Sequence, residues 1–266
     1  MRVLSQRISI DVTRTGSGPA ILLVHGTGDD QSCWRQVVPL LAGRHHVHAM
    51  DRRGRGGSGD ATGHSIAAEA GDIVAVLDRI GPATLVGHSF GAICALEAAA
   101  RRPSSLERLV LYEPPVPVAG TADYSGVSAR INELCARARL EEALCLFLVE
   151  VTGLDPGLVK LLRRVPGFAG RAAVADTIAR EIDATHRYAL DHGRLAALTV
   201  PTLLLTGERS AQGLRDATAL VASLLPCASS EVLPGQAHRA MEGAPALLAD
   251  AIDTFAGRSS HEAHSR

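Results

Sequence analysis

Short apolar runs recur along this 266-residue chain, and segments with helical spacing separate them. Runs rich in Val, Ile and Leu and bounded by turn residues are typical of strands that are buried on both faces of a mostly parallel sheet. The runs are AILLVHG, HHVHAMD, ATLVGHS, RLVLYEPP, PTLLLTGE and SSEVLPG, and residues 65–80 and 93–102 show the intervening helical pattern. This alternation predicts an α/β fold with a doubly wound, mostly parallel sheet, and residues 7–16 are expected to form an antiparallel hairpin at its edge.

The alternation stops in the middle of the chain. From about Tyr124 to Asp191 the sequence has successive helical patterns without a strand-like run. A helical block inserted between two strands of a sheet commonly lies over the functional site as a lid. The predicted division is a core domain of residues 1–118 and 199–258, a helical cap insertion of residues 119–198 and a frayed polar tail of residues 259–266.

Composition and charge narrow the classes of partner. The chain is 46% hydrophobic and 21% charged, and its formal net charge of −1 offers no electrostatic attraction to nucleic acid or to an anionic membrane. Its first residues contain no long apolar run of the kind found in signal peptides and membrane spans. The five cysteines form no C-x-x-C pair, which favours reduced thiols. We therefore expect a cytoplasmic protein that acts on a small-molecule substrate and binds neither nucleic acid nor membrane.

In the segment TLVGHSFGAICALEAAARR, a strand-like run turns abruptly into an alanine-rich helical pattern. Gly87-His88-Ser89-Phe90-Gly91 at this turn matches G-x-S-x-G, and its place between a strand and a helix is the context in which that motif forms a nucleophile elbow. A turn this tight forces the serine into an unfavourable backbone conformation, and neighbours that carry a Cβ atom would collide. The turn is expected to lift the Ser89 hydroxyl above the sheet and to aim a helix N-terminus at it.

Four segments together resemble the α/β-hydrolase superfamily, and the resemblance covers nearly the whole chain. LLVHGTGDD is similar to that family's His-Gly turn, MDRRGRGGSGD to its Asp-Arg-x-Gly-x-Gly-x-Ser loop, VGHSFGA to its nucleophile elbow and LPGQAHRAMEGAP to its terminal histidine loop. The segments occur in the family's order, with an insertion where the family accommodates a cap. The resemblance implies an α/β-hydrolase fold of the serine-nucleophile branch, similar to esterases and lactonases.

The same resemblance implies roles for individual residues. Carried over by position, Ser89 is the nucleophile, His238 is the general base, and the backbone N–H groups of Thr27 and Phe90 form the oxyanion hole. This set is chemically coherent, because a serine needs an imidazole to take its proton. The imidazole in turn needs a carboxylate to fix its tautomer and to stabilise its charged form.

The carboxylate departs from the family's usual pattern. The position that commonly carries it, after the penultimate strand, holds Ser210, with Glu208 nearby. A second family arrangement places the acid after the strand that follows the elbow helix, where this chain has Glu113. Glu113 ends a predicted strand on the same sheet edge as Ser89, and Pro114-Pro115 stiffens the loop behind it. Glu113 is therefore the predicted acid, and Glu208 is the alternative.

Other side chains near these motifs have supporting assignments. His25 and His88 beside the oxyanion turn are expected to hold loops by hydrogen bonds, and with Trp34 and Phe147 they are candidates for contact with the substrate. The apolar face of the cap around Phe147 is expected to roof the site. GRGGSG matches the dinucleotide fingerprint G-x-G-x-x-G, but no helical pattern directly follows these glycines. Since His, Cys and carboxylates show no ligand spacing either, the sequence predicts neither an organic cofactor nor a metal.

Residues and resemblance together predict a serine hydrolase that cleaves a small, fairly apolar ester, lactone or thioester through an acyl-enzyme. A serine nucleophile argues against haloalkane dehalogenase and epoxide hydrolase chemistry, in which a carboxylate attacks. Two alternatives stay open. One is a ligand-binding or receptor-like homologue with little turnover, which the serine at the usual acid position favours. The other is a non-ester reaction on the same triad, such as C–C hydrolysis, perhydrolysis or lyase chemistry.

Overall fold

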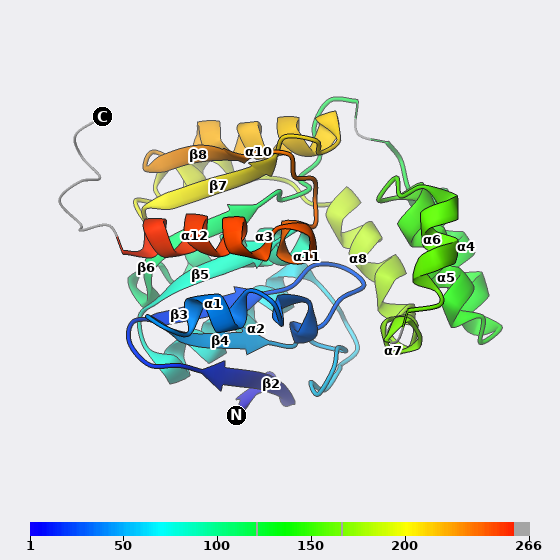
Figure 1. Ribbon diagram of the computed structural model, residues 1–266, viewed down its shortest axis with the longest axis horizontal. Coiled ribbons are helices and arrows are strands. Elements are labelled where there is room, and N and C mark those ends of the chain that lie inside the picture. The colour runs from blue at the N-terminus through cyan, green and yellow to red at the C-terminus, as the bar shows by residue number, and fades with distance from the viewer. Residues whose placement is uncertain (121, 166, 258–266) are drawn as a thin grey trace.

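The computed structural model describes residues 1–120, 122–165 and 167–257, so the predicted tail of residues 259–266 lies outside the described residues. Its centre is an eight-stranded sheet in the order β1-β2-β4-β3-β5-β6-β7-β8 (Figure 1). β2 pairs antiparallel with β1 and β4, and every other pairing is parallel. The strands are β1 Arg2–Ser5, β2 Ile8–Thr15, β3 Ala20–Val24, β4 His46–Met50, β5 Ala83–His88, β6 Leu106–Tyr112, β7 Thr202–Gly207 and β8 Ala228–Leu233.

Both faces of the sheet are covered by helices, which confirms the predicted doubly wound α/β fold. In β3, Leu22 and Val24 pack into one hydrophobic core, whereas Ile21 and Leu23 pack into the other. Because alternate side chains are buried on opposite faces, the strands read as continuous apolar runs. One face carries α2 Ile66–Ile80, α3 Phe90–Arg101 and α10 Gln212–Leu224; the other carries the 3₁₀ helix η1 Gln31–Trp34 together with α1 Val38–Leu41, α11 Ala240–Gly243 and α12 Pro245–Ala256. The short helices η2 Pro103–Ser105 and α9 His192–Ala196 lie in connections.

The N-terminal hairpin differs from the prediction for residues 7–16. That segment is a single strand, β2, and its hairpin partner is β1, which precedes it. The turn between them consists of Gln6 and Arg7, whose φ angles are 46° and 69°. Two-residue hairpin turns need left-handed residues, for which Gly and Asn are the usual signal. Neither residue gives that signal here, so the sequence did not mark the turn.

A block of helices is inserted between β6 and β7, beyond the carboxyl ends of the parallel strands (Figure 1), and we keep for it the name cap, under which it is predicted above. It has a hydrophobic core of its own, and α8 is the cap helix nearest the sheet. Among the described residues, no helix is long and apolar enough to span a membrane. The cap helices are α4 Ser125–Ala136, α5 Leu140–Glu150, α6 Pro156–Leu162, α7 Phe168–Ala172 and α8 Asp176–His186.

Candidate active site

The G-x-S-x-G turn joins β5 to α3, and its serine has a strained backbone. Ser89 is the N-cap residue of α3 with φ 55° and ψ −126°, a backbone conformation that residues other than glycine rarely adopt. A Cβ atom on Gly87 would lie 2.6 Å from the Ala92 Cα atom, and one on Gly91 would overlap the carbonyl oxygen of His25. Glycine on both sides of the serine is therefore a steric requirement of this turn.

Glu113 and His238 form a direct carboxylate–imidazole pair. The structure places Nδ1 of His238 2.6 Å from Oε2 of Glu113, while Oε1 accepts a hydrogen bond of 2.7 Å from the backbone N–H of Gly207. Glu113 follows β6 immediately, is fully buried, and has a φ of 49°. Since Nδ1 donates its proton to the carboxylate, Nε2 of His238 is left free to accept one. This is the arrangement that a general base needs.

The two other residues considered for the acid position make different contacts. Glu208 is exposed, and its Oε2 accepts a hydrogen bond of 2.7 Å from the backbone N–H of Gly235. The hydroxyl of Ser210 is buried and has no hydrogen-bond partner among the described residues. Of the three candidates, Glu113 is the one whose carboxylate contacts His238.

His88 ties the histidine loop to the serine turn. Its Nε2 donates a hydrogen bond of 2.8 Å to the carbonyl of His238, and the two rings lie 4.5 Å apart between centroids. Burial and the neighbouring His238 keep the pKa of His88 well below its usual value, so the ring is neutral at physiological pH. Tyr112, at the end of β6, also donates a hydrogen bond from its hydroxyl to the carbonyl of Ala237. The loop that carries His238 is therefore tied to His88, which precedes Ser89, and to Tyr112, which precedes Glu113.

The loop after β3 passes directly beside the serine. A Cβ atom on Gly26 would lie 2.9 Å from the Cβ of Ser89, so only glycine allows this approach. Nδ1 of His25 donates to the Gly26 carbonyl at 2.9 Å, and its Nε2 accepts from the backbone N–H of Arg52 at 3.1 Å. Burial and the charge of Arg52 lower the pKa of His25 to about 4, which keeps the ring neutral and able to make both bonds. His25 thus holds the loop, as the sequence suggested.

The two aromatic candidates for substrate contact have different surroundings. Trp34 is fully buried in the hydrophobic core on the η1 face of the sheet, where its ring meets that of His88 edge-on. Phe147 comes from α5 of the cap, and its Cε1 lies 3.5 Å from the position of a Cβ on Gly28. Leu144 and Ile178 of the cap reach the same glycine. Apolar cap side chains therefore line the loop beside the serine, whereas Trp34 has the surroundings of a core residue.

A buried ionic network beside this loop was not found by sequence reasoning. Arg52 donates to Glu69 of α2 at 2.9 Å and to both carboxylate oxygens of Glu181 of α8 at 2.9 and 3.0 Å. Arg55 donates to Glu181 as well, and His64 lies 3.0 Å from Glu69. Burial disfavours a charged Glu181, but Arg52 and Arg55 outweigh that effect and hold its pKa well below the usual value. The available sequence signal for this network was the presence of arginines directly after an apolar strand. The partners of Arg52 lie 17 and 129 positions away along the chain, so the sequence did not indicate them.

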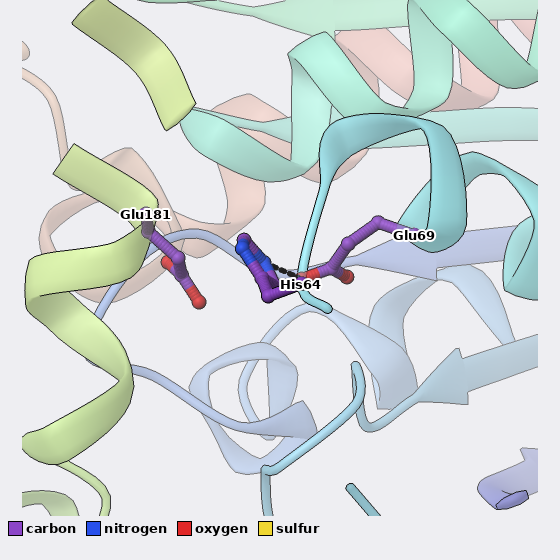
Figure 2. A group of neighbouring side chains, drawn as sticks. All are labelled: His64, Glu69 and Glu181. Atoms are coloured by element: carbon purple, nitrogen blue, oxygen red, sulfur yellow. Dashed lines mark hydrogen bonds and ion pairs between the residues drawn. The ribbon is translucent and has the colours of Figure 1, made fainter. Parts of the chain in front are cut away.

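The same network contains the one group of metal-ligand type found in the part of the chain that the structure describes. His64, Glu69 and Glu181 converge so that one possible ligand atom of each lies within 4.8 Å of the others (Figure 2). Both carboxylates are already paired with guanidinium groups, however, and a divalent cation there would face the positive charges of Arg52 and Arg55. We therefore interpret the cluster as an ionic network, and the absence of a metal stays a prediction.

A second polar network links the loop to the cap and to the histidine loop. Asp29 receives two hydrogen bonds from Arg239, at 2.8 and 3.2 Å, and lies 3.3 Å from Arg171 of α7. Arg171 also donates to the carbonyl of Gly28 at 3.1 Å. Burial by itself would raise the pKa of Asp29, but the two arginines hold it well below the usual value. Asp29 thus stays charged and joins three segments around the site.

The glycines of GRGGSG have a packing explanation. A Cβ atom on Gly56 would overlap the carboxylate of Asp51, which accepts hydrogen bonds of 2.8 Å from the backbone N–H groups of Gly57 and Gln31. The next helix, α2, begins only at Ile66. The glycines therefore let the loop fold closely around Asp51.

Comparison with known proteins settles the family. The sequence profile of the alpha/beta hydrolase family matches residues 21–251. The chain belongs to the alpha/beta hydrolase family. This alpha/beta hydrolase is 29% identical over 265 residues to 2-(acetamidomethylene)succinate hydrolase of Mesorhizobium japonicum, with 96% of this chain and 94% of the relative covered. It is 24% identical over 264 residues to pimeloyl-acyl-carrier-protein methyl ester esterase of Aeromonas hydrophila, with 94% of this chain and 100% of the relative covered.

Solved structures agree with this assignment. An alpha/beta hydrolase from Sphaerobacter thermophilus superimposes with a TM-score of 0.85 at 30% identity, with 96% of this chain and 99% of that chain covered. N-formylmaleamic acid deformylase from Pseudomonas putida S16 superimposes with a TM-score of 0.70 at 25% identity, with 94% and 99% covered. The predicted superfamily and fold are therefore confirmed, and relatives named as hydrolases and esterases support hydrolase activity for this alpha/beta hydrolase.

Proposed function

We propose that this chain is a serine hydrolase that cleaves a small, fairly apolar ester, lactone or thioester through an acyl-enzyme. The observation that carries the proposal is the Glu113–His238 pair at 2.6 Å, in which the carboxylate is fully buried; the backbone of His238 is bonded to His88, the residue before a serine in a strained turn. A carboxylate that accepts the Nδ1 proton leaves Nε2 as the base, which is the requirement for activating a serine hydroxyl. The receptor-like alternative was favoured by the lack of an acid at position 210, and Glu113 supplies that carboxylate from another strand.

The proposed reaction has two halves. His238 Nε2 takes the proton of the Ser89 hydroxyl while the serine oxygen attacks the carbonyl carbon of the substrate, and the resulting oxyanion accepts hydrogen bonds from the N–H groups of Thr27 and Phe90. The protonated imidazole then gives its proton to the leaving oxygen or sulfur, which leaves an ester on Ser89. Water attacks that ester with His238 again as the base, and the carboxylic acid product and free serine result.

The substrate class follows from the lining of the site and from the relatives. Phe147, Leu144 and Ile178 bring apolar surface of the cap to the loop at Gly28, which suits an apolar acyl or alkoxy group. One relative is named a methyl ester esterase, which supports ester cleavage here. The relatives named 2-(acetamidomethylene)succinate hydrolase and N-formylmaleamic acid deformylase show that proteins of this fold also carry other hydrolytic specificities.

Labelling with a fluorophosphonate tests the nucleophile. The wild-type protein is expected to gain one adduct per chain by mass spectrometry, located on Ser89, because the probe phosphonylates serines that a neighbouring base activates. The variant Ser89→Ala is expected to gain none. Labelling that survives this substitution would show that another residue is the nucleophile and would end the proposal.

Turnover separates an enzyme from a binding protein on the same scaffold. A series of p-nitrophenyl esters and acyl thioesters of increasing chain length is expected to be hydrolysed by the wild type and not by Ser89→Ala. Labelling of Ser89 without turnover of any member of the series would favour the receptor-like alternative, because the serine would then be activated without release of product.

A further inference from the structure

Arg52 touches both halves of the proposed oxyanion hole. Its Nη2 atom donates a hydrogen bond of 3.0 Å to the carbonyl of Gly26, and its guanidinium carbon lies 4.9 Å from the centre of the Phe90 ring. Gly26 contributes the C=O, and Thr27 the N–H, of one planar peptide group. A donor that fixes the carbonyl therefore fixes the direction of the Thr27 N–H, which is the proposed oxyanion donor.

The charge on Arg52 also acts on this peptide group. Hydrogen bonds polarise one another, and a cationic donor on a carbonyl makes the N–H of the same peptide a stronger donor. His25 adds a second hydrogen bond to the Gly26 carbonyl, from its Nδ1 atom at 2.9 Å. Its other ring nitrogen, Nε2, accepts a hydrogen bond from the backbone N–H of Arg52. The Gly26–Thr27 peptide is thus held by two donors, one of them charged.

Arg52 is itself held in place by a residue of the cap. Glu181 on α8 accepts hydrogen bonds from Arg52 through both carboxylate oxygens. Figure 2 shows Glu181 reaching from α8 toward His64 and Glu69, which come from the core domain. The side chains of Arg52 and Glu181 are both fully buried. The Nη2 atom that donates to Gly26 is thus the same atom that contacts both oxygens of Glu181, so the carboxylate fixes the position of that donor.

We propose that Glu181 and Arg52 are positioning residues for the oxyanion hole, so that docking of the cap helix α8 orients the Gly26–Thr27 peptide for catalysis. The inference rests on the proposed function for its catalytic consequence, whereas the orientation of the peptide is a property of the resting protein. The cap then has two tasks: its apolar side chains line the site, and its carboxylate organises the donors of the core domain.

The test uses Glu181→Gln and a matched control, Asp72→Asn. Asp72 is a fully buried carboxylate of α2 that accepts hydrogen bonds from Arg53 at 2.7 Å and from the side chain of Gln6 at 3.4 Å. Glu181→Gln removes the carboxylate charge that Arg52 and Arg55 share, Asp72→Asn removes the one that Arg53 contacts, and both substitutions keep the side-chain shape. The readouts are the ¹H–¹⁵N signal of the Thr27 amide in the free protein, and kcat and KM on the best p-nitrophenyl ester.

Glu181→Gln is expected to broaden or double the Thr27 signal and to lower kcat by about 10- to 100-fold, less than the loss of a whole oxyanion donor, with KM changed by less than about twofold. Asp72→Asn is expected to leave the Thr27 signal and kcat as in the wild type. A single sharp Thr27 signal with unchanged kcat in Glu181→Gln would overturn the inference, and so would equal effects of the two variants.

If Glu181→Gln does not fold, the variant Arg52→Lys provides a second test. Lysine keeps the positive charge, but a single ammonium lacks the fork that lets Arg52 reach Gly26, Glu69 and Glu181 together. It is expected to disturb the Thr27 signal, and an undisturbed signal would overturn the inference. If the wild type hydrolyses none of the esters while the Thr27 signal still responds as expected, the positioning stands and the proposed function fails.

Discussion

At the residue scale, Glu113 has two hydrogen bonds that serve different purposes. One oxygen accepts from the Gly207 backbone, which fixes the carboxylate between β6 and β7, and the other meets His238. The side chain is fully buried, so its negative charge is screened little by water. In the proposed reaction this charge acts chiefly when His238 becomes positive.

Glu113→Gln is expected to lower kcat by about 10³- to 10⁴-fold, because an amide can orient the imidazole but cannot balance its charge and favours the wrong tautomer. Steady-state hydrolysis of a p-nitrophenyl ester measures the effect, with circular dichroism to check folding. Glu208→Gln is the matched control, since Glu208 is exposed and its carboxylate accepts a hydrogen bond from the backbone of Gly235, and it should retain nearly wild-type kcat. A folded Glu113→Gln with most of the wild-type rate would rule out Glu113 as the triad acid.

At the element scale, α5 brings Phe147 and Leu144 close to Gly28 in the loop after β3. Phe147 approaches Gly28 more closely than Leu144 or Ile178 does. Its ring is nearly buried, so truncating it opens space at the loop.

Phe147→Ala is expected to raise kcat/KM for p-nitrophenyl hexanoate relative to the acetate by about tenfold, because added methylene groups gain apolar contacts in the enlarged site. The ratio of the two kcat/KM values measures the effect. Val159→Ala on α6 is the control, since Val159 belongs to the same cap core. An equal shift in both variants would mean that a loosened cap, and not the space beside Gly28, determines the preference.

At this scale, the sequence predicted those features whose residues are close together along the chain. The elbow was predicted because its strand, its glycines and its helix are contiguous, and Glu113 because a strand end and two prolines mark it. The network of Arg52, Glu69 and Glu181 was missed, because three separate elements supply it and each residue alone reads as a surface charge. The Gln6-Arg7 turn was missed because its strain is compensated by strand pairing.

At the scale of the whole molecule, neutral buried histidines couple stability to pH. Burial, together with the neighbouring His46, lowers the pKa of His48 to about 4, and burial with Arg52 lowers that of His25 to about 4. In the unfolded chain a histidine has a pKa near 6.5. As the pH falls from about 6.5 to about 4, these histidines therefore bind protons in the unfolded state but not in the folded state, and the free energy of unfolding decreases.

His48→Gln is expected to make this acid-induced loss smaller by at most about 3 kcal/mol, since glutamine does not titrate. Urea unfolding between pH 7 and pH 4 measures the free energy of unfolding directly. His48 lies on β4 and is not one of the proposed catalytic residues, so activity at neutral pH serves as a check on folding. The exposed His192 offers a control, because His192→Gln should leave the pH dependence unchanged. An identical slope for wild type and His48→Gln would contradict the expectation.

The positive φ angles of Ser89 and Glu113, 55° and 49°, also bear on how this protein can be engineered. Non-glycine residues held in such conformations cost on the order of 1–3 kcal/mol each. Glycine at position 89 would relieve that cost and remove the hydroxyl at the same time. A selection for thermal stability alone would therefore enrich variants that lack the Ser89 hydroxyl. Libraries aimed at a sturdier protein should leave these two positions fixed and screen for turnover alongside survival.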